Sequence, residues 1–235
     1  MGRRDKILSP RLEAIVNMVT PGYKIADIGT DHGFVPISLI ERKIIPAAIA
    51  MDVNDGPLAS ARENIEEAKL LNKIEVRKSN GLENLTVNEV DCAIFAGMGG
   101  NLIIKLLSDH WKVTRSLKEF ILGPHSEWEK VRRFLLDYGF SIVQEEMVKD
   151  AGKYYLAMKV ISSDLKESWN PVELAFGKLL LEAKNLILRE VLQREITIQE
   201  RILEQLKVET GEHIESRKKE VGLKINLLNQ GLKYY

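Results

Sequence analysis

The residues Lys24-Ile25-Ala26-Asp27-Ile28-Gly29-Thr30-Asp31-His32-Gly33 decide the fold class, because they run from a short apolar strand directly into a glycine-containing turn. The apolar run has the length and character of a parallel strand that is covered on both faces. Asp27 lies at the end of this strand, and Gly29 begins the turn. The stretch therefore predicts the first strand–turn–helix unit of an α/β sheet.

Two carboxylates in this turn indicate what kind of ligand it would accept. The pattern Asp-x-Gly-x-Asp-x-Gly differs from the dinucleotide fingerprint Gly-x-Gly-x-x-Gly, because Asp31 stands where a glycine would approach a pyrophosphate. A carboxylate there repels a diphosphate and attracts a cationic or amine-bearing ligand. S-adenosylmethionine (SAM) carries a sulfonium and an ammonium and no phosphate, so the turn favours SAM. An ordinary strand–turn–helix corner is the alternative at this point.

The composition favours a globular chain of one or two domains. With 235 residues, 45% of them hydrophobic, the chain is large enough to bury a substantial core. Lysine plus arginine and aspartate plus glutamate each number 34, so the chain lacks the overall basic character of many nucleic-acid-binding proteins. An RNA partner would therefore have to be met by a local basic patch.

The single cysteine, Cys92, excludes an intramolecular disulfide framework and fits a reducing compartment. It lies in an apolar run, which favours packing in the core over a catalytic thiol. No apolar stretch approaches the roughly 20 residues of a membrane span, and residues 1–6 are charged and lack an apolar signal region. We therefore expect a cytoplasmic protein without a membrane partner.

A second strand–acid–turn–helix unit follows the first. Pro46 precedes an apolar run over 47–51 that ends at Asp52, roughly 20 residues beyond the first turn. An acidic residue in this place commonly accepts hydrogen bonds from ribose hydroxyls. Pro57 stands near the start of a predicted helix whose apolar side chains recur at helical spacing. Two such units in succession favour a mononucleotide-binding sheet.

The third and fourth predicted strands also end in polar or glycine-rich turns. Strand 74–78 runs into Asn80 and Gly81, and Asn80 offers both a donor and an acceptor to an adenine edge. An ordinary Asn-Gly turn is the alternative there. The nearly continuous apolar strand 90–96 ends in Gly97-Met98-Gly99-Gly100, where glycines allow the backbone to approach a ligand closely.

The remaining elements continue an alternating pattern of strands and helices. Strand 120–122 precedes a helix for which Ser126 and Glu129 predict a capping box. Strands 141–143 and 154–160 have no helix between them, which predicts an antiparallel hairpin at the sheet edge. The other helices expected before residue 120 cover 9–20, 35–42 and 101–110.

The C-terminal part of the chain has a different period. Beyond Pro171, apolar residues recur every three to four positions, with an interruption at 210–211, which predicts an antiparallel, coiled-coil-like helical hairpin. Its charges alternate in sign, which favours a hairpin that packs against itself and the sheet domain over a dedicated tRNA clamp. We expect the domains 1–161 and 171–235, joined by a polar linker over 162–170.

The order of the predicted elements, β-α-β-α-β-α-β-α-β-α-β-β, resembles the class I SAM-dependent methyltransferases throughout residues 24–161. That resemblance implies a Rossmann-like α/β fold with a seven-stranded, mostly parallel sheet and helices on both faces. Several motifs narrow it to the bacterial tRNA adenine-N1 methyltransferase family that modifies adenine 22, and the C-terminal hairpin matches the same family. The motifs are Ser9–Ile15, Asp27–Gly33, Ser79–Leu82 and Gly97–Gly100.

Carried over by position, this resemblance implies a SAM site along the ends of four strands. The methionine side of SAM would be lined by Asp27, Gly29, Asp31, His32 and Gly33. The ribose and adenine would be held by Asp52, Val53, Asn54, Asn80 and Gly81, with Gly97 close by. Asp31 is also the candidate catalytic residue, because a carboxylate can stabilise the cationic product of N1 methylation; it could instead only bind the SAM ammonium.

At the place expected for the target adenine, this sequence departs from the pattern of related enzymes. Gly97, Met98 and Gly99 stand where related enzymes carry an Asn/Asp-Pro-Pro-Tyr motif, and both that motif and its stacking aromatic are missing. A base turned out of its stack needs a new stacking partner, for which Phe34 and Tyr154 are the candidates. Phosphate contacts and a solvated face both stay open for the basic start of the chain, formed by Arg3, Arg4, Lys6 and Arg11.

The implied function is methyl transfer from SAM to N1 of adenine 22 in tRNA, and two alternatives stay open. One is a SAM-dependent methyltransferase of a small molecule or protein, and the other is a non-catalytic tRNA-binding module. A nicotinamide-dependent oxidoreductase is disfavoured by Asp31. We expect no metal, since the histidines show no paired ligand spacing, and a monomer or weak dimer is compatible with the sequence.

Overall fold

The computed structural model describes residues 8–163, 167–208 and 211–235. The chain divides into two compact units, Met1–Glu167 and Ser168–Tyr235, so the division falls within the segment 162–170 that was expected to be a linker.

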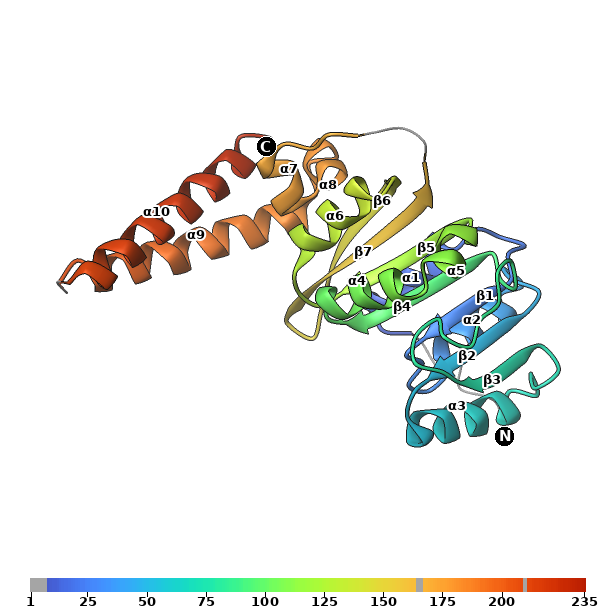
Figure 1. The fold of residues 1–235 in the computed structure, drawn as a ribbon. Coiled ribbons are helices and arrows are strands. Elements are labelled where there is room, and N and C mark those ends of the chain that lie inside the picture. The colour runs from blue at the N-terminus through green and yellow to red at the C-terminus, as the bar shows by residue number, and fades with distance from the viewer. Residues whose placement is uncertain (1–7, 164–166, 209–210) are drawn as a thin grey trace. The chain divides into compact units, whose positions relative to one another are not determined.

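The first unit is built on a seven-stranded sheet with the order β3-β2-β1-β4-β5-β7-β6 (Figure 1). The pairs among β1 to β5 are parallel, whereas β7 runs antiparallel to both β5 and β6. The predicted seven-stranded, mostly parallel sheet with an antiparallel edge hairpin is therefore confirmed. The strands are β1 (Ile25–Ile28), β2 (Ala48–Asp52), β3 (Ile74–Lys78), β4 (Cys92–Met98), β5 (Glu119–Pro124), β6 (Phe140–Asp150) and β7 (Lys153–Ser162).

Two groups of helices pack on this sheet. Helices α1, α2 and α3 contact one another in sequence, and α4 contacts both α5 and α6. The helices of this unit are α1 (Pro10–Met18), α2 (Phe34–Glu41), α3 (Asp55–Glu67), α4 (Gly100–Asp109), α5 (Trp111–Ser116) and α6 (Trp128–Asp137). The strands β1, β2, β4 and β5 are mostly buried, and Cys92 has an exposed fraction of 0%. Burial raises the pKa of the Cys92 thiol, which fits a packing role and not that of a nucleophile.

The predicted capping box at the start of α6 is wrong. The helix begins at Trp128, and its N-cap is Glu127, which has a left-handed φ of 59° and makes no side-chain capping bond. The turn before it is instead fixed by other contacts: the His125 N–H donates to the Met98 carbonyl at 2.8 Å, and the Trp128 indole donates to the Pro124 carbonyl at 2.9 Å. The first bond ties the turn to the end of β4, and the second ties the start of α6 to the end of β5. The chain enters the helix through the left-handed Glu127.

The second unit is helical, with α7 (Pro171–Phe176), α8 (Lys178–Glu182), α9 (Leu186–Leu206) and α10 (Glu212–Leu232). The two long helices α9 and α10 pack together as the predicted hairpin (Figure 1). The periodicity before residue 186 predicted no breaks, but the helix is interrupted twice. Gly177 adopts a φ of 94° between α7 and α8, and the Asn185 side chain caps α9 by accepting from the Leu188 N–H.

Candidate functional site

The carboxyl ends of β1, β2 and β4 meet at the turn after β1. In the sheet register, Ile28 of β1 stands between Met51 of β2 and Phe95 of β4. The N–H groups of Gly29 and Thr30 both donate to the Met51 carbonyl at 2.8 Å. The first turn is thereby fixed to the end of β2, at the edge where ligands bind in open α/β sheets.

A cavity of about 450 Å³ opens beside this turn. Its volume falls within the range of roughly 300–1,000 Å³ that is usual for small-molecule sites. It contains the first group of predicted SAM residues and two predicted substrate residues, Arg11 and Phe34. The lining residues are Leu8, Ser9, Arg11, Leu12, Asp27, Gly29, Thr30, Asp31, His32, Gly33, Phe34, Val35 and Ala96. Arg3, Arg4 and Lys6 lie outside the described residues.

The two carboxylates of the cavity differ in their surroundings. Asp27 is only 5% exposed, and its burial raises its pKa to about 6. Within the described parts of the chain, no lysine or arginine forms an ion pair with Asp27. Asp31 is exposed and lies 3.3 Å from His32 Nε2, while the His32 ring stacks on Phe34 at 5.1 Å. A cationic ligand in the cavity would therefore supply the partner that the buried carboxylate lacks.

The second group of predicted SAM residues lies along the next strand ends and does not line this cavity. Asp52, at the end of β2, is partly buried, and its Oδ1 accepts from the Asn54 N–H at 2.7 Å. Val53 is 51% exposed beside it. The Ser79 N–H donates to the Asp52 carbonyl at 2.9 Å, which places Asn80 and the following Gly81 at the same edge of the sheet.

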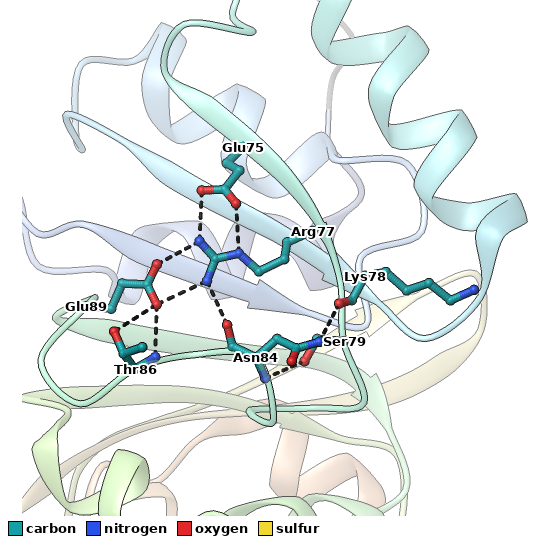
Figure 2. Close-up of polar contacts among 7 residues, drawn as sticks. All are labelled: Glu75, Arg77, Lys78, Ser79, Asn84, Thr86 and Glu89. Carbon is teal, nitrogen blue, oxygen red and sulfur yellow. Dashed lines mark hydrogen bonds and ion pairs between the residues drawn. The ribbon is translucent and has the colours of Figure 1, made fainter.

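The loop that follows β3 and carries Asn80 is held by Arg77. Figure 2 shows the guanidinium between Glu75 and Glu89, with a further hydrogen bond from Nη1 to the Asn84 carbonyl at 2.7 Å. The Thr86 N–H also donates to Glu89, and hydrogen bonding to Arg77 lowers the pKa of Glu89 to about 2. One side chain of β3 thus holds the loop at Asn84 and at Glu89.

Replacing Arg77 by methionine is expected to lower the free energy of unfolding by roughly 1–3 kcal/mol, the usual cost of losing hydrogen bonds to charged groups. It should also weaken SAM binding several-fold, because the loop with Asn80 loses its anchor. Lys78→Met is the matched control, since Lys78 pairs with Asp55 on the surface, where such pairs contribute at most about 1 kcal/mol. Urea unfolding and SAM calorimetry measure both effects. Equal losses in the two variants would contradict the anchoring role.

Gly29 in the first turn and Gly100 after β4 both stand where an added side chain would meet a packed neighbour. Gly29 has a φ of 73°, and a Cβ on it would lie 2.3 Å from the Met98 Cε, so the Met98 side chain covers the turn. At the start of α4, a Cβ on Gly100 would lie 2.5 Å from the Ser126 carbonyl oxygen. Gly99 is the N-cap of α4 with an ordinary φ of −66°. Met98 covers the turn beside the cavity, and neither Met98 nor Gly99 is among the residues that line it.

Gly100→Ala is expected to destabilise the fold by about 1–3 kcal/mol, the usual cost of forcing atoms into a packed site, because the contact is with backbone. Gly99→Ala is its control, since the nearest atom to that Cβ is the Ser126 Oγ at 3.6 Å. Thermal unfolding of the two variants measures the difference. A Gly99 variant that is destabilised as much as the Gly100 variant would contradict this packing argument.

A second, smaller cavity of about 20 Å³ adjoins the first. It lies at the carboxyl ends of β4 and β5 and near the beginning of the antiparallel strand β7. The two cavities share Arg11, Leu12 and Ala96. The predicted residue Gly97 lines the smaller cavity, and so does Tyr155, whereas Tyr154 lines neither. The full lining is Arg11, Leu12, Ile15, Ala96, Gly97, Gly123, His125, Val148, Tyr155, Leu156 and Ala157.

Sequence reasoning missed His125 and Tyr155 in this second cavity. The sequence did contain a signal for each of them. His125 follows the predicted fifth strand, at the edge where the other site residues gather. Neighbouring residues of a strand point to opposite faces of the sheet, so the sequence predicts that only one of Tyr154 and Tyr155 faces the site. The Tyr154 ring lies 5.5 Å from Lys149 Nζ instead.

Comparison with known proteins shows similarity over nearly the whole chain. A family model described as "Methyltransferase domain" matches residues 8–158. The tRNA (adenine(22)-N(1))-methyltransferase of Bacillus subtilis (strain 168) is 28% identical over 228 residues, which cover 95% of this chain and 96% of that protein. The ribosomal protein L11 methyltransferase of Caldicellulosiruptor saccharolyticus is 33% identical, but over only 46% of this chain.

Solved structures show the same similarity in three dimensions. Sp1610 of Streptococcus pneumoniae, provisionally assigned as a tRNA (m1A22) methyltransferase, has a TM-score of 0.89 at 31% identity and covers 96% of this chain and 100% of that chain. The same protein in complex with S-adenosyl-L-methionine has a TM-score of 0.86. The B. subtilis m1A22 tRNA methyltransferase has a TM-score of 0.86 at 27% identity and covers 96% of this chain and 98% of that chain.

Two further features concern other classes of site. None of the described helices is both long and apolar enough to cross a membrane. In the described ranges, no three histidine, cysteine, aspartate or glutamate residues are grouped so that they could hold a metal ion.

Proposed function

The chain belongs to the bacterial tRNA (adenine-22)-N1-methyltransferase family, within the methyltransferase-domain proteins, and we propose that it transfers a methyl group from SAM to N1 of adenine 22 in tRNA. The observation that carries this proposal is the extent of the similarity. It covers 95% of the chain and so includes the C-terminal helices as well as the methyltransferase domain. We place the reaction in the cytoplasm, with tRNA as the partner.

The cavity at the end of β1 fits SAM by its chemistry. Its carboxylates, Asp27 and Asp31, match the positive charges of the ligand, and the covered turn at Gly29 keeps the backbone close. We assign the ammonium to the buried Asp27, because a cation compensates a buried carboxylate most effectively. Asp52 would accept from the ribose hydroxyls, and Asn80 would face the adenine edge.

The reaction does not require the protein to remove a proton from the base before methyl transfer. When bound, SAM supplies an electrophilic methyl carbon attached to a sulfonium. Adenine N1 attacks this carbon with its lone pair, so that the N–C bond forms as the C–S bond breaks and the positive charge passes to the base. The residues around the site must therefore align N1 with the methyl carbon and exclude water. Asp31, exposed at the rim, can stabilise the cationic base as it forms.

The first alternative is a SAM-dependent methyltransferase of a small molecule or protein. The similarity to the ribosomal protein L11 methyltransferase supports a protein substrate, but it spans only 46% of this chain and 33% of the relative's length. The similarity to the B. subtilis tRNA methyltransferase spans 95% of this chain. The second alternative, a non-catalytic tRNA-binding module, would not need a buried carboxylate in a SAM-sized cavity.

Methyl transfer from labelled SAM to unmodified tRNA tests the proposal. Parallel substrates carry guanine at position 22 or 1-deazaadenine, which keeps the adenine ring but replaces N1 by a carbon. We expect label in the adenine tRNA and none in the other two. Label in all three tRNAs would contradict the assigned atom. Binding of SAM without transfer to tRNA would favour another methyl acceptor, and absence of SAM binding would overturn the assignment of the cavity.

A further inference from the structure

Three side chains converge beside the SAM cavity from separate elements of the first unit. The Arg11 guanidinium, on α1, lies over the Tyr155 ring of β7, with its Cζ 5.6 Å from the ring centroid. The His125 ring, after β5, meets the same tyrosine edge-on at 5.8 Å. A Cβ on Gly97 would lie 3.5 Å from His125 Nε2 and 3.6 Å from Arg11 Nη1, so bare backbone at the end of β4 faces both groups.

This cluster has the chemistry of a nucleobase site. An aromatic ring offers a stacking face, and a guanidinium can stack on a ring or pair with a phosphate. Partial burial, with Arg11 and Lys153 nearby, lowers the pKa of His125, so its ring is neutral near pH 7 and can both donate and accept. Gly97 leaves room for a flat ring next to the end of β4. Among the described residues, no acidic side chain lines the small cavity.

Arg11 is held in place only loosely. Within the described ranges it makes no hydrogen bond or ion pair, and its contact with the Tyr155 ring is its one aromatic contact there. The small cavity has a volume of about 20 Å³, room for about one water molecule. A base can therefore reach Tyr155 only if a side chain moves aside, and Arg11 is the side chain shared by both cavities that has the length and freedom to do so.

We propose that Tyr155 is the stacking surface for the adenine to be methylated and that Arg11 covers this ring until tRNA binds. The arriving base replaces the guanidinium on the ring, and Arg11 turns outward to pair with a phosphate of the RNA. The ring then lies in the small cavity, and its N1 points through the shared boundary at Ala96 toward the SAM cavity. This inference rests on the proposed function and adds the residues that receive the base.

Stacking of the base on Tyr155 explains how the site functions without the aromatic residue of the Asn/Asp-Pro-Pro-Tyr motif, which this chain lacks. In this chain the stacking ring comes from β7 and not from the turn after β4. The end of β4 contributes backbone alone at Gly97, which leaves the space that the motif would fill. A base that leaves its stack in RNA regains a stacking partner at Tyr155 and so recovers part of the cost of unstacking.

The test compares Tyr155→Met with Tyr155→Phe. Methionine keeps much of the apolar volume of the side chain but has no aromatic face, whereas phenylalanine keeps the face. We expect kcat/KM for tRNA to fall about 10- to 100-fold in the methionine variant and to stay within about twofold in the phenylalanine variant. The SAM dissociation constant should be unchanged in both. Tyr138→Met, at an exposed tyrosine near the opposite end of the β6–β7 hairpin, is the control for loss of a ring elsewhere.

Arg11→Gln tests the second half of the proposal. We expect weaker tRNA binding and a slope of log Kd against log salt that is smaller by about one, as for the loss of one phosphate contact. SAM binding should persist. An unchanged slope would overturn the role given to Arg11. Lys153→Gln removes another positive charge near His125 and controls for a general loss of positive charge.

The outcomes separate this inference from the proposed function. A wild-type enzyme that methylates adenine 22 and is equally active with methionine at position 155 would overturn the inference alone. A drop in Tyr154→Met but not in Tyr155→Met would assign the stacking to the other tyrosine and overturn it as well. A wild-type protein that binds SAM and methylates no tRNA would overturn both. Should Tyr155→Met fail to fold, Tyr155→Leu takes its place against the same phenylalanine variant.

Discussion

Replacing Asp27 by asparagine is expected to weaken SAM binding by about 100-fold at pH 7.5 and, at the same time, to stabilise the unliganded protein. The loss of affinity follows because a neutral amide cannot pair with the SAM ammonium, and truncating one partner of a buried charge pair commonly costs about 2–5 kcal/mol. The gain in stability follows because the carboxylate is only 5% exposed and forms no ion pair with a lysine or arginine among the described residues. Binding and folding thus make opposite demands on one side chain.

The raised pKa of Asp27 determines the direction in which the stability of the unliganded protein changes with pH. The pKa of Asp27 is raised from 3.8 to about 6 in the folded protein, so the folded state holds the proton more tightly than the unfolded state. The stability of the unliganded protein should therefore fall as the pH rises from about 4 to 6 and then level off. A pKa difference of this size lowers the free energy of unfolding by on the order of 3 kcal/mol above that window. The asparagine variant should lack this fall.

SAM affinity should depend on pH in the opposite sense. Below about pH 6 the ligand must displace a proton from Asp27, so the dissociation constant should rise towards tenfold per pH unit. Calorimetry from pH 5 to 8, with urea unfolding over the same range, measures both curves. Asp31→Asn is the matched control, because its side chain is 77% exposed and its removal should leave the stability curve unchanged. A pH-independent affinity in the wild type would contradict the pairing with Asp27.

The parts of the fold that were predicted from the sequence depend on local patterns. The stretch from Lys24 to Gly33 combines an apolar strand, two glycines and two carboxylates within ten residues, and each of these acts on its immediate neighbours. The structure places its turn on the cavity. The edge hairpin was recognised for a similar reason, because two strands that follow each other without a helix must pair antiparallel.

The parts that were missed depend on contacts between distant residues. Arg11 was a predicted site residue, but its contact with Tyr155, and the contact of Tyr155 with His125, join elements that lie far apart in the sequence. The wrong capping box at Ser126 has the same origin, since the turn there is set by the end of β4. Likewise the Lys159 ammonium donates to the Met18 carbonyl at 2.9 Å, a pairing that only the folded sheet creates.

A second large effect is expected at Arg132, which anchors the edge hairpin that carries Tyr155. The Arg132 Nε on α6 donates to Glu145 Oε1 on β6 at 2.8 Å, and both side chains are 0% exposed. Arg132→Met leaves the Glu145 carboxylate in the core without this partner. Removing one member of a buried pair commonly costs about 3–5 kcal/mol, so we expect a loss of that size in the free energy of unfolding.

Two further variants separate the charge from the packing at this position. Arg133→Met removes a neighbouring arginine whose pair with Glu129 is about half exposed, and it should cost no more than about 0.5 kcal/mol. Combining Arg132→Met with Glu145→Leu replaces the pair by apolar side chains and should recover most of the loss, because an apolar pair carries no desolvation cost. Urea unfolding of the four proteins measures the series. If the double variant is less stable than Arg132→Met, then the hydrogen bonds around Glu145, and not its stranded charge, hold the hairpin against α6.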